Sequence, residues 1–300
     1  MRGAWLWYGV LSIGVIGISW SAIFIREADA PALAIGWWRM ALSGAPMGAL
    51  ALLHHRRSRE PLTRESFAPL VLSAALLALH FAFWVESLHR TSVATSVVLV
   101  AAQPLYVAMA APLLLDEPVA RHVWVAIAVA TGGALLMAAE DLGNGFGTLV
   151  GDLFAALGGV TAAGYFIIGR RVRPSVSWFR YVGVVYPLSA LMLLAMVLIA
   201  RDPLVGYSAK TWTMLALTAV VSQLIGHSAI NWSLAYISAV VVSIMILLEP
   251  VITTLLAIPI LDETPTGVEL VGGALVLVGV YLAIRPRQEE RLTLEVAAAD

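Results

Sequence analysis

Long apolar segments constrain this chain more than any other feature. Ten windows of mostly apolar residues follow one another, and short connections with charged residues, glycine or proline separate them. A helix needs about 20 such residues to cross about 30 Å of hydrocarbon. We therefore predict an all-α polytopic membrane protein with ten transmembrane helices. The windows are residues 4–25, 33–53, 68–88, 93–115, 120–139, 149–169, 178–200, 211–235, 238–261 and 267–285.

The composition excludes several other classes of protein. Only 12% of the residues are charged and 60% are apolar, whereas soluble domains carry about 25% charged residues. With 18 basic and 19 acidic residues the net charge is −1, so no basic field attracts nucleic acid. The chain has no cysteine, which rules out disulfides, thiolate nucleophiles, cysteine-bound zinc and iron–sulfur clusters.

The first window resembles a signal peptide in two respects. Met1-Arg2 precedes an apolar run, and Ala28-Asp29-Ala30 mimics a small-x-small cleavage pattern. Pro31 follows directly and should block cleavage, and the run is as long as a full membrane span. We expect a retained helix.

Arginine and lysine in the connections predict the orientation, because cytoplasmic loops carry the excess of positive charge. Twelve basic residues lie on one side of the predicted membrane: Arg2, Arg56, Arg57, Arg59, Arg64, Arg121, Arg170, Arg171, Arg173, Arg285, Arg287 and Arg291. Four lie on the other side: Arg26, Arg90, Arg201 and Lys210. Both termini are therefore expected in the cytoplasm.

The sequence also repeats itself, which is typical of transporters. At an offset of 146, Ser87, Leu88, Ser92, Pro104 and Asp116-Glu117 meet Ser233, Leu234, Ser238, Pro250 and Asp262-Glu263. At an offset of 141, Trp37-Trp38-Arg39 and Pro46 meet Trp178-Phe179-Arg180 and Pro187. At an offset of 140, Gly132-Gly133 meets Gly272-Gly273.

The repeat predicts two five-helix units and a short tail. We place the units at residues 1–144 and 145–286, and a polar C-terminal tail at 287–300. Five is an odd number, so equivalent helices run in opposite directions and the repeats are inverted.

These repeated residues resemble the drug/metabolite transporter superfamily, with two EamA-type repeats. The features that carry the resemblance are the Trp-x-Arg early in the second helix of each half, Glu249-Pro250, and the Asp-Glu after the fourth helix of each half. Among its members the chain is most similar to bacterial aromatic amino-acid exporters of the inner membrane. The first half departs from the pattern, because Gln103-Pro104 stands where the second half has Glu249-Pro250.

Polar residues inside apolar windows are candidates for a binding site, because such groups need protein partners or a wet cavity in a membrane. Several fall near the middle of the third, fourth, eighth and ninth windows, which predicts a cavity at the interface of the two repeats. They are His80, Gln103, Gln223, His227, Asn231 and Glu249.

Gln103 and Glu249 precede prolines that interrupt backbone hydrogen bonding and permit kinks. We expect Pro104 and Pro250 to be positions of kinking or gating. One interpretation is that both side chains satisfy freed backbone groups. The alternative is that the desolvated Glu249 carboxyl acts as a neutral donor or a proton carrier.

The histidines, arginines and aromatic residues each leave two interpretations open. His80 and His227 either join helices by hydrogen bonds or contact substrate; their spacing gives no metal site. Arg39 and Arg180 are interpreted mainly as interfacial, with pairing to a substrate carboxylate as the alternative. The aromatic residues away from the helix ends either pack or line a cavity for an apolar substrate, namely Trp20, Phe83, Trp84, Tyr106, Tyr165 and Trp232.

The predicted function is secondary export of aromatic or hydrophobic amino acids across the bacterial inner membrane by alternating access. The substrate and the location follow from the resemblance alone. Gly206 to Thr211 lacks the second glycine of a P-loop, so we expect gradient-driven transport. No nucleophile–base set or metal cluster indicates an enzyme, and we expect no cofactor.

Other predicted partners and functions stay open. Alternatives in the same superfamily are multidrug, nucleoside or other-metabolite export, and a passive channel is the alternative of another class. The expected partners are the small-molecule substrate, the lipid bilayer and, as a second candidate, a proton. The expected state is a monomer or a weak dimer.

Overall fold

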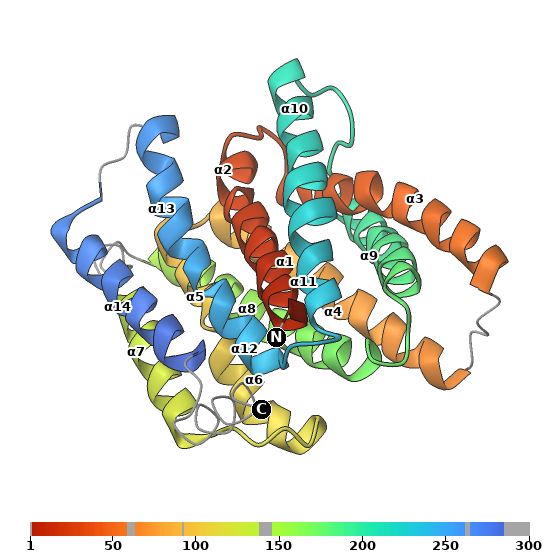
Figure 1. Cartoon of the computed structure of the whole chain (residues 1–300). Helices are drawn as coiled ribbons and strands as arrows, with labels where there is room; N and C mark the ends of the chain where they lie inside the picture. Colours follow the sequence, from red (N-terminus) through yellow and green to blue (C-terminus); the bar gives the residue numbers. More distant parts are fainter. Residues whose placement is uncertain (1, 59–63, 92, 138–145, 262–264, 285–300) are drawn as a thin grey trace.

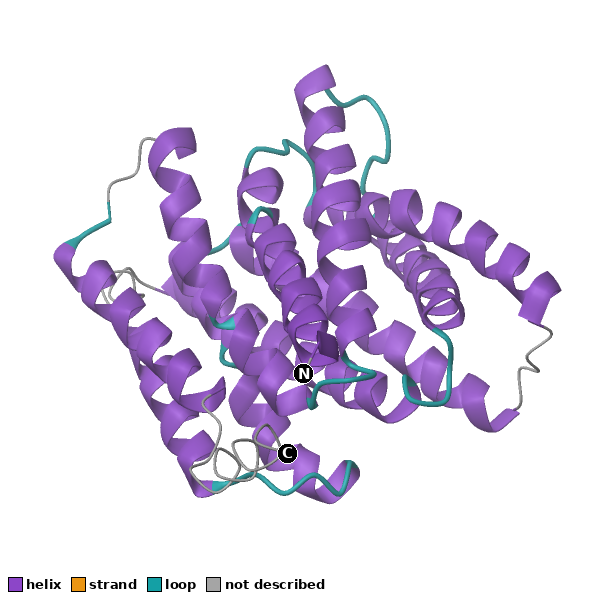
Figure 2. Ribbon diagram, in the orientation of Figure 1, coloured by secondary structure: helices purple, strands orange, loops and turns teal. Residues whose placement is uncertain are grey.

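The computed structural model describes residues 2–58, 64–91, 93–137, 146–261 and 265–284, and every element in these ranges is a helix (Figure 2). The all-helical prediction is therefore confirmed for this part of the chain. Asp262-Glu263, the predicted boundary between residues 144 and 145, and the tail at 287–300 lie outside the described residues.

The helices of the first half overlap the first five apolar windows, in the same order. The first and fourth windows each contain two consecutive helices. The elements are α1 (Arg2–Ser19), α2 (Ser21–Arg26), α3 (Ala32–Ser58), α4 (Arg64–Leu88), α5 (Val93–Ala101), α6 (Gln103–Leu114) and α7 (Arg121–Met137).

The second half follows the remaining five windows in the same way. Its third segment begins and ends as α-helix and contains a ten-residue π-helix, η2, in its middle. The elements are α8 (Phe146–Val172), α9 (Trp178–Ala200), α10 (Ala209–Leu217), η2 (Thr218–His227), α11 (Ser228–Ser233), α12 (Ala239–Ile246), α13 (Leu248–Leu261) and α14 (Gly267–Ile284).

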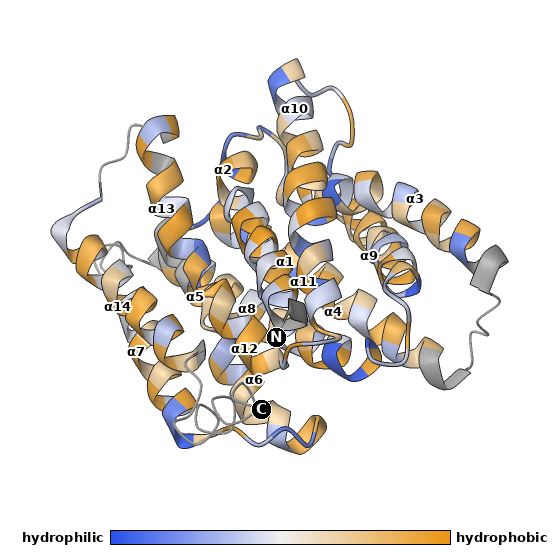
Figure 3. Cartoon of the chain, viewed as in Figure 1, coloured by the Kyte–Doolittle hydropathy of each residue, from blue (hydrophilic) through white to orange (hydrophobic). Residues whose placement is uncertain are grey.

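The outer surface of the helices is apolar. Trp5 is 81% exposed and Ile199 is 83% exposed, and hydrophobic residues run along the helices in Figure 3. Such a surface fits lipid, not water. Six helical segments among the described residues are long and apolar enough to cross a membrane, namely 5–27, 67–88, 149–172, 178–200, 209–233 and 239–260.

The molecule is thus a multi-pass helical membrane protein. The count of ten spans and the cytoplasmic termini stay predictions.

Helix packing relates the two halves. The most extensive interfaces pair α3 with α9 and α7 with α14, on opposite flanks of the molecule (Figure 1). Two further interfaces pair α4 with α8, and α1 with η2 and α11. In the repeat, α3 corresponds to α9 and α7 to α14, so exchanging the halves leaves the first two interfaces unchanged. Because α1 corresponds to α8, and α4 to the segment that contains η2 and α11, the exchange converts each of the last two interfaces into the other. This exchange pattern fits a two-fold relation between the repeats.

Glycine lets these helices approach closely. A Cβ added at Gly17 would lie 2.9 Å from the Cα of Gly226, where α1 meets η2. A Cβ added at Gly133 would lie 2.6 Å from the carbonyl oxygen of Gly272, where α7 meets α14, whereas one at Gly132 would meet open space. Only one glycine of the Gly132-Gly133 pair therefore faces the neighbouring helix.

Two arginines make corresponding contacts near the ends of the first helical segment of each half. Arg26 ends α2 and donates from Nη1 to the carbonyl of Leu88 at 2.7 Å. Arg170, in the last turn of α8, donates from Nη1 to the carbonyl of Leu234 at 3.0 Å. Leu88 and Leu234 are equivalent at the offset of 146. Arg170 also pairs with Glu117 at 2.6 Å.

Candidate functional site

Breaks in the helices concentrate near the centre of the molecule. α5 and α6 meet at Ala102 beside Pro104, and α12 and α13 meet at Leu247, shortly before Pro250. A proline has no amide hydrogen to donate, so it interrupts the hydrogen bonds of a continuous helix but is tolerated in a first turn. Each break therefore places the start of a new helix in the middle of a span. Gln103 and Glu249 consequently lie in the first turns of α6 and α13. A helix N-terminus favours a carboxylate such as that of Glu249.

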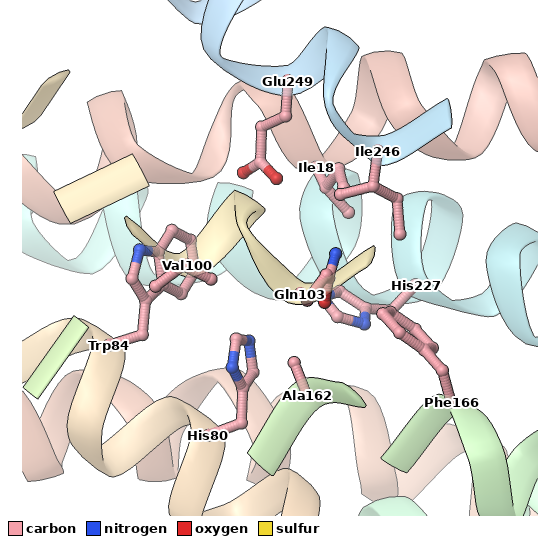
Figure 4. Close-up of a pocket in the computed structure, with 10 residues that line it drawn as sticks. All are labelled: Ile18, His80, Trp84, Val100, Gln103, Ala162, Phe166, His227, Ile246 and Glu249. Atoms are coloured by element: carbon pink, nitrogen blue, oxygen red, sulfur yellow. The ribbon is translucent and has the colours of Figure 1, made fainter. Parts of the chain in front are cut away.

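Both of these side chains line a small cavity between the two halves. The Glu249 carboxyl and the His80 ring point into it from opposite sides (Figure 4). The cavity volume, taken over positions that a water centre can occupy, is about 20 Å³, which is room for about one water molecule. An amino acid does not fit in this conformation. The lining residues are Ile18, His80, Trp84, Val100, Gln103, Ala162, Phe166, His227, Ile246 and Glu249.

The two histidines face each other across part of this cavity. Their ring centroids lie 6.3 Å apart, and both side chains are buried. His80 Nδ1 lies 3.0 Å from the carbonyl oxygen of Gly158. A carbonyl can only accept, so Nδ1 carries the proton, and Nε2 of a neutral His80 is an acceptor. The His80 ring also stacks on Trp84, with centroids 5.7 Å apart.

Arg39 lies beside the cavity wall. Its side chain is fully buried, and its Nε donates to Gln223 Oε1 at 2.8 Å. Its Nη1 donates to the hydroxyl of Ser21. The guanidinium carbon lies 4.3 Å from the ring centroid of Phe81 and 5.9 Å from that of Trp84, so it stacks on aromatic faces.

The interfacial interpretation of Arg39 was wrong. Arg39 is 0% exposed, whereas a snorkelling arginine exposes its guanidinium to water or headgroups. Arg180 is 9% exposed and lies in the first turn of α9, which is a helix end as predicted. The tryptophans beside them indicated a helix end. α3 starts at Ala32, within one residue of the predicted window, and Arg39 lies about two turns inside it, where other helices cover its side chain. The Trp38 indole instead donates to the carbonyl of Leu204 at 2.9 Å.

A network of buried hydrogen bonds extends from Arg39 through the second half. Tyr165 donates to Asn231 Oδ1 at 2.7 Å, and Asn231 Nδ2 donates to the Tyr186 hydroxyl at 3.0 Å. Tyr186 bonds Ser228 at 3.1 Å, and the Ser228 hydroxyl donates to the carbonyl of Gln223 at 3.1 Å. Sequence reasoning did not single out Tyr186, Ser228 or Ser21, because tyrosine and serine are common in helices and here only distant partners give them a role.

The structure brings together part of the predicted set. His80, Trp84, Gln103, His227 and Glu249 line the cavity. Gln223 does not line the cavity but accepts a hydrogen bond from Arg39 beside the cavity wall. Tyr165 and Asn231 belong to the hydrogen-bond network next to Arg39.

The other predicted aromatic residues lie elsewhere. Trp20 stacks on Phe24 at 5.6 Å and Phe83 on Phe154 at 5.9 Å between ring centroids. Tyr106 is half-buried. None of these three residues lines the cavity.

Fold and cavity together define a helical membrane protein with a polar site enclosed between two related halves. The model of the EamA-like transporter family matches the chain twice, at residues 4–139 and 149–285. The chain belongs to this family, and it is a transporter of the drug/metabolite transporter superfamily. Proteins of this family are in general not enzymes.

Other comparisons address the fold alone. A solved crystal structure shares it with a TM-score of 0.76 at 17% sequence identity, over 92% of this chain and 96% of that chain. No curated protein sequence matches the chain.

Proposed function

We propose that this chain is a secondary exporter of aromatic or bulky hydrophobic amino acids in the bacterial inner membrane. The observation that carries the proposal is the central cavity, where Trp84 and Phe166 supply apolar surface and Glu249 and two histidines supply polar groups. Such a combination suits a molecule with an aromatic side chain and a charged backbone. The resemblance to aromatic amino-acid exporters supports the same substrate class.

Alternating access is the proposed mechanism. The cavity is too small for an amino acid, so substrate entry requires the repeats to move apart on one side. The Arg26–Leu88 and Arg170–Leu234 contacts lie at predicted opposite membrane faces. Opening one face would break one contact and leave the other intact, as inverted repeats permit. The energy comes from a transmembrane gradient of the substrate, or from a proton gradient that is coupled to transport through protonation of Glu249.

A multidrug substrate is the second candidate. A carboxyl facing aromatic walls also suits a lipophilic cation, because ring faces attract cations and Glu249 balances the charge.

Uptake into proteoliposomes tests the substrate class. Purified protein should transport radiolabelled L-phenylalanine and L-tryptophan faster than a nucleoside or a lipophilic cation. Protein-free liposomes and the Glu249→Ala variant are the controls, and both should show only leak. Flux of a nucleoside or a lipophilic cation without flux of either amino acid would reject the proposed substrate.

A further inference from the structure

Arg39 carries a permanent charge in the interior of the molecule, and neutral groups hold it. Its two hydrogen-bond partners, Gln223 and Ser21, are both uncharged. Its Nη2 is buried and has no hydrogen-bond partner among the described residues. A buried guanidinium of this kind is costly unless another group completes its hydrogen bonds. The helix therefore maintains an incompletely satisfied cation next to the cavity.

Further unsatisfied donors surround it. Trp84 Nε1 and Gln223 Nε2 are buried and have no partner within the described ranges. Both atoms can only donate hydrogen bonds, as can Arg39 Nη2. Gln223 contacts Arg39 directly, and the Trp84 ring both lines the cavity and lies 5.9 Å from the Arg39 guanidinium carbon. The three donors thus lie on side chains that contact one another through Arg39, and of these Trp84 lines the cavity.

Buried donors without acceptors are costly, so a ligand with hydrogen-bond acceptors would be stabilised beside them. A carboxylate has two oxygens and about four lone-pair sites, and it matches the planar fork of arginine. The Glu249 carboxyl also points into the cavity (Figure 4). A cation at one wall and a carboxyl at another complement a zwitterion.

We propose that Arg39 is the carboxylate-binding residue of the central site, assisted by the Trp84 and Gln223 donors, with Glu249 receiving the ammonium group of the same substrate. This inference rests on the proposed function, in that it assigns a substrate to that site. It specifies the class as molecules with a carboxylate, and it disfavours lipophilic cations that lack one.

Three probes separate the two ends of the ligand. L-phenylalanine has a carboxylate and an ammonium group, 3-phenylpropionate has only the carboxylate, and 2-phenylethylamine has only the ammonium group. Calorimetry on the full chain in detergent gives the dissociation constant of each. The wild type should bind both carboxylates, and Arg39→Gln should weaken both by about 10- to 100-fold, because one charge-assisted hydrogen-bond pair is lost. Binding of 2-phenylethylamine should change little.

A second variant covers the case in which Arg39→Gln does not fold. Trp84→Phe keeps a ring in the cavity wall and removes only the indole donor. It should weaken the two carboxylates relative to 2-phenylethylamine, which a loss of packing alone would not do. Phe83→Leu, beside it in sequence but outside the cavity lining, is the matched control and should leave the ratio unchanged.

The outcomes are distinct from those of the transport assay. Binding of 3-phenylpropionate that depends on Arg39, without amino-acid flux, would reject the proposed cargo and support the carboxylate site. A folded Arg39→Gln protein that binds carboxylates as tightly as the wild type would overturn the inference. So would a wild type that binds 2-phenylethylamine but neither carboxylate.

Discussion

At position 249 the charge of the side chain can be tested apart from its shape, because glutamine has nearly the same shape as glutamate but no titratable group. The Glu249 carboxyl lines the central cavity in the first turn of α13, beside a helix break. Gln103 has the corresponding place in the first half. Glutamine has the same length as glutamate but cannot exchange a proton, so of this pair of equivalent positions only Glu249 can carry one.

The Glu249→Gln variant tests the proton-carrier role. We expect it to fold and to exchange L-phenylalanine across liposome membranes, but to lose the acceleration that an imposed proton gradient gives to wild-type flux. Flux at several internal pH values, with equal substrate on both sides, measures this response. Glu86→Gln is the control, since Glu86 pairs with Arg90 away from the cavity. A variant with the pH response of the wild type would exclude Glu249 as the proton carrier.

Arg39 shows what a single sequence hides at the residue scale. Its neighbours Trp37 and Trp38 are typical of a membrane interface, and nothing local in the sequence indicates that other helices bury its side chain completely. The partners that determine its environment, Gln223 and Ser21, come from other helices. Glu249 and His80 were easier to predict, because a polar residue in the middle of a long apolar window signals an interior position by itself.

Helix contacts depend on which of two adjacent glycines faces the partner. Gly133 packs against Gly272, and Gly132 points into open space. Gly133→Ala should therefore lower the melting temperature, with a cost of about 1–3 kcal/mol for overpacking. Gly132→Ala should be neutral or slightly stabilising, because alanine favours helix. Thermal unfolding in detergent, followed by circular dichroism, compares the two. Equal melting temperatures would show that α7 and α14 do not pack as described.

The Arg170 contact should control opening of its face. Arg170→Ala removes hydrogen bonds to Leu234 and Glu117. Losing them should raise the population open on that face by about tenfold, since hydrogen bonds to charged groups contribute about 1.5–3 kcal/mol.

The cysteine-free chain provides a direct readout of this opening. Ala162→Cys places one thiol in the cavity wall, and a membrane-impermeant maleimide reports its accessibility from either side. In the Arg170→Ala background, labelling from the predicted cytoplasmic side should be faster. Arg171→Ala is the matched control, because Arg171 is an exposed neighbour. Faster labelling from the opposite side would contradict the assigned role.

The windows and the repeat anticipated the succession of helices, but not all of their interruptions. Apolar length locates each segment within a few residues, because the bilayer sets it. The π-helix at Thr218–His227 and the break at Trp20 have no proline to announce them. Both lie near the contact between Gly17 of α1 and Gly226 of η2, and no local sequence pattern contains this contact between the halves.

At the scale of the whole molecule, the exchange pattern of helix interfaces fits a two-fold relation between the repeats, and five helices in each repeat predict that the two run in opposite orientations. Inverted repeats place equivalent loops on opposite faces of the membrane. Cysteines introduced at Arg90 and Tyr236, in the connections after α4 and α11, should therefore be labelled from opposite sides in sealed vesicles. Labelling of both from the same side would reject the inverted topology.

Counterflow of an amino acid is the most direct test of the central claim that this chain is a carrier for aromatic amino acids. Proteoliposomes loaded with excess unlabelled L-phenylalanine are diluted into a trace of labelled L-phenylalanine, and internal label is followed with time. The account predicts a transient accumulation of label above equilibrium, because an alternating-access site returns loaded, and liposomes with the Glu249→Ala variant should lack it. Simple equilibration without accumulation would indicate a passive channel, and the absence of any uptake would contradict the substrate.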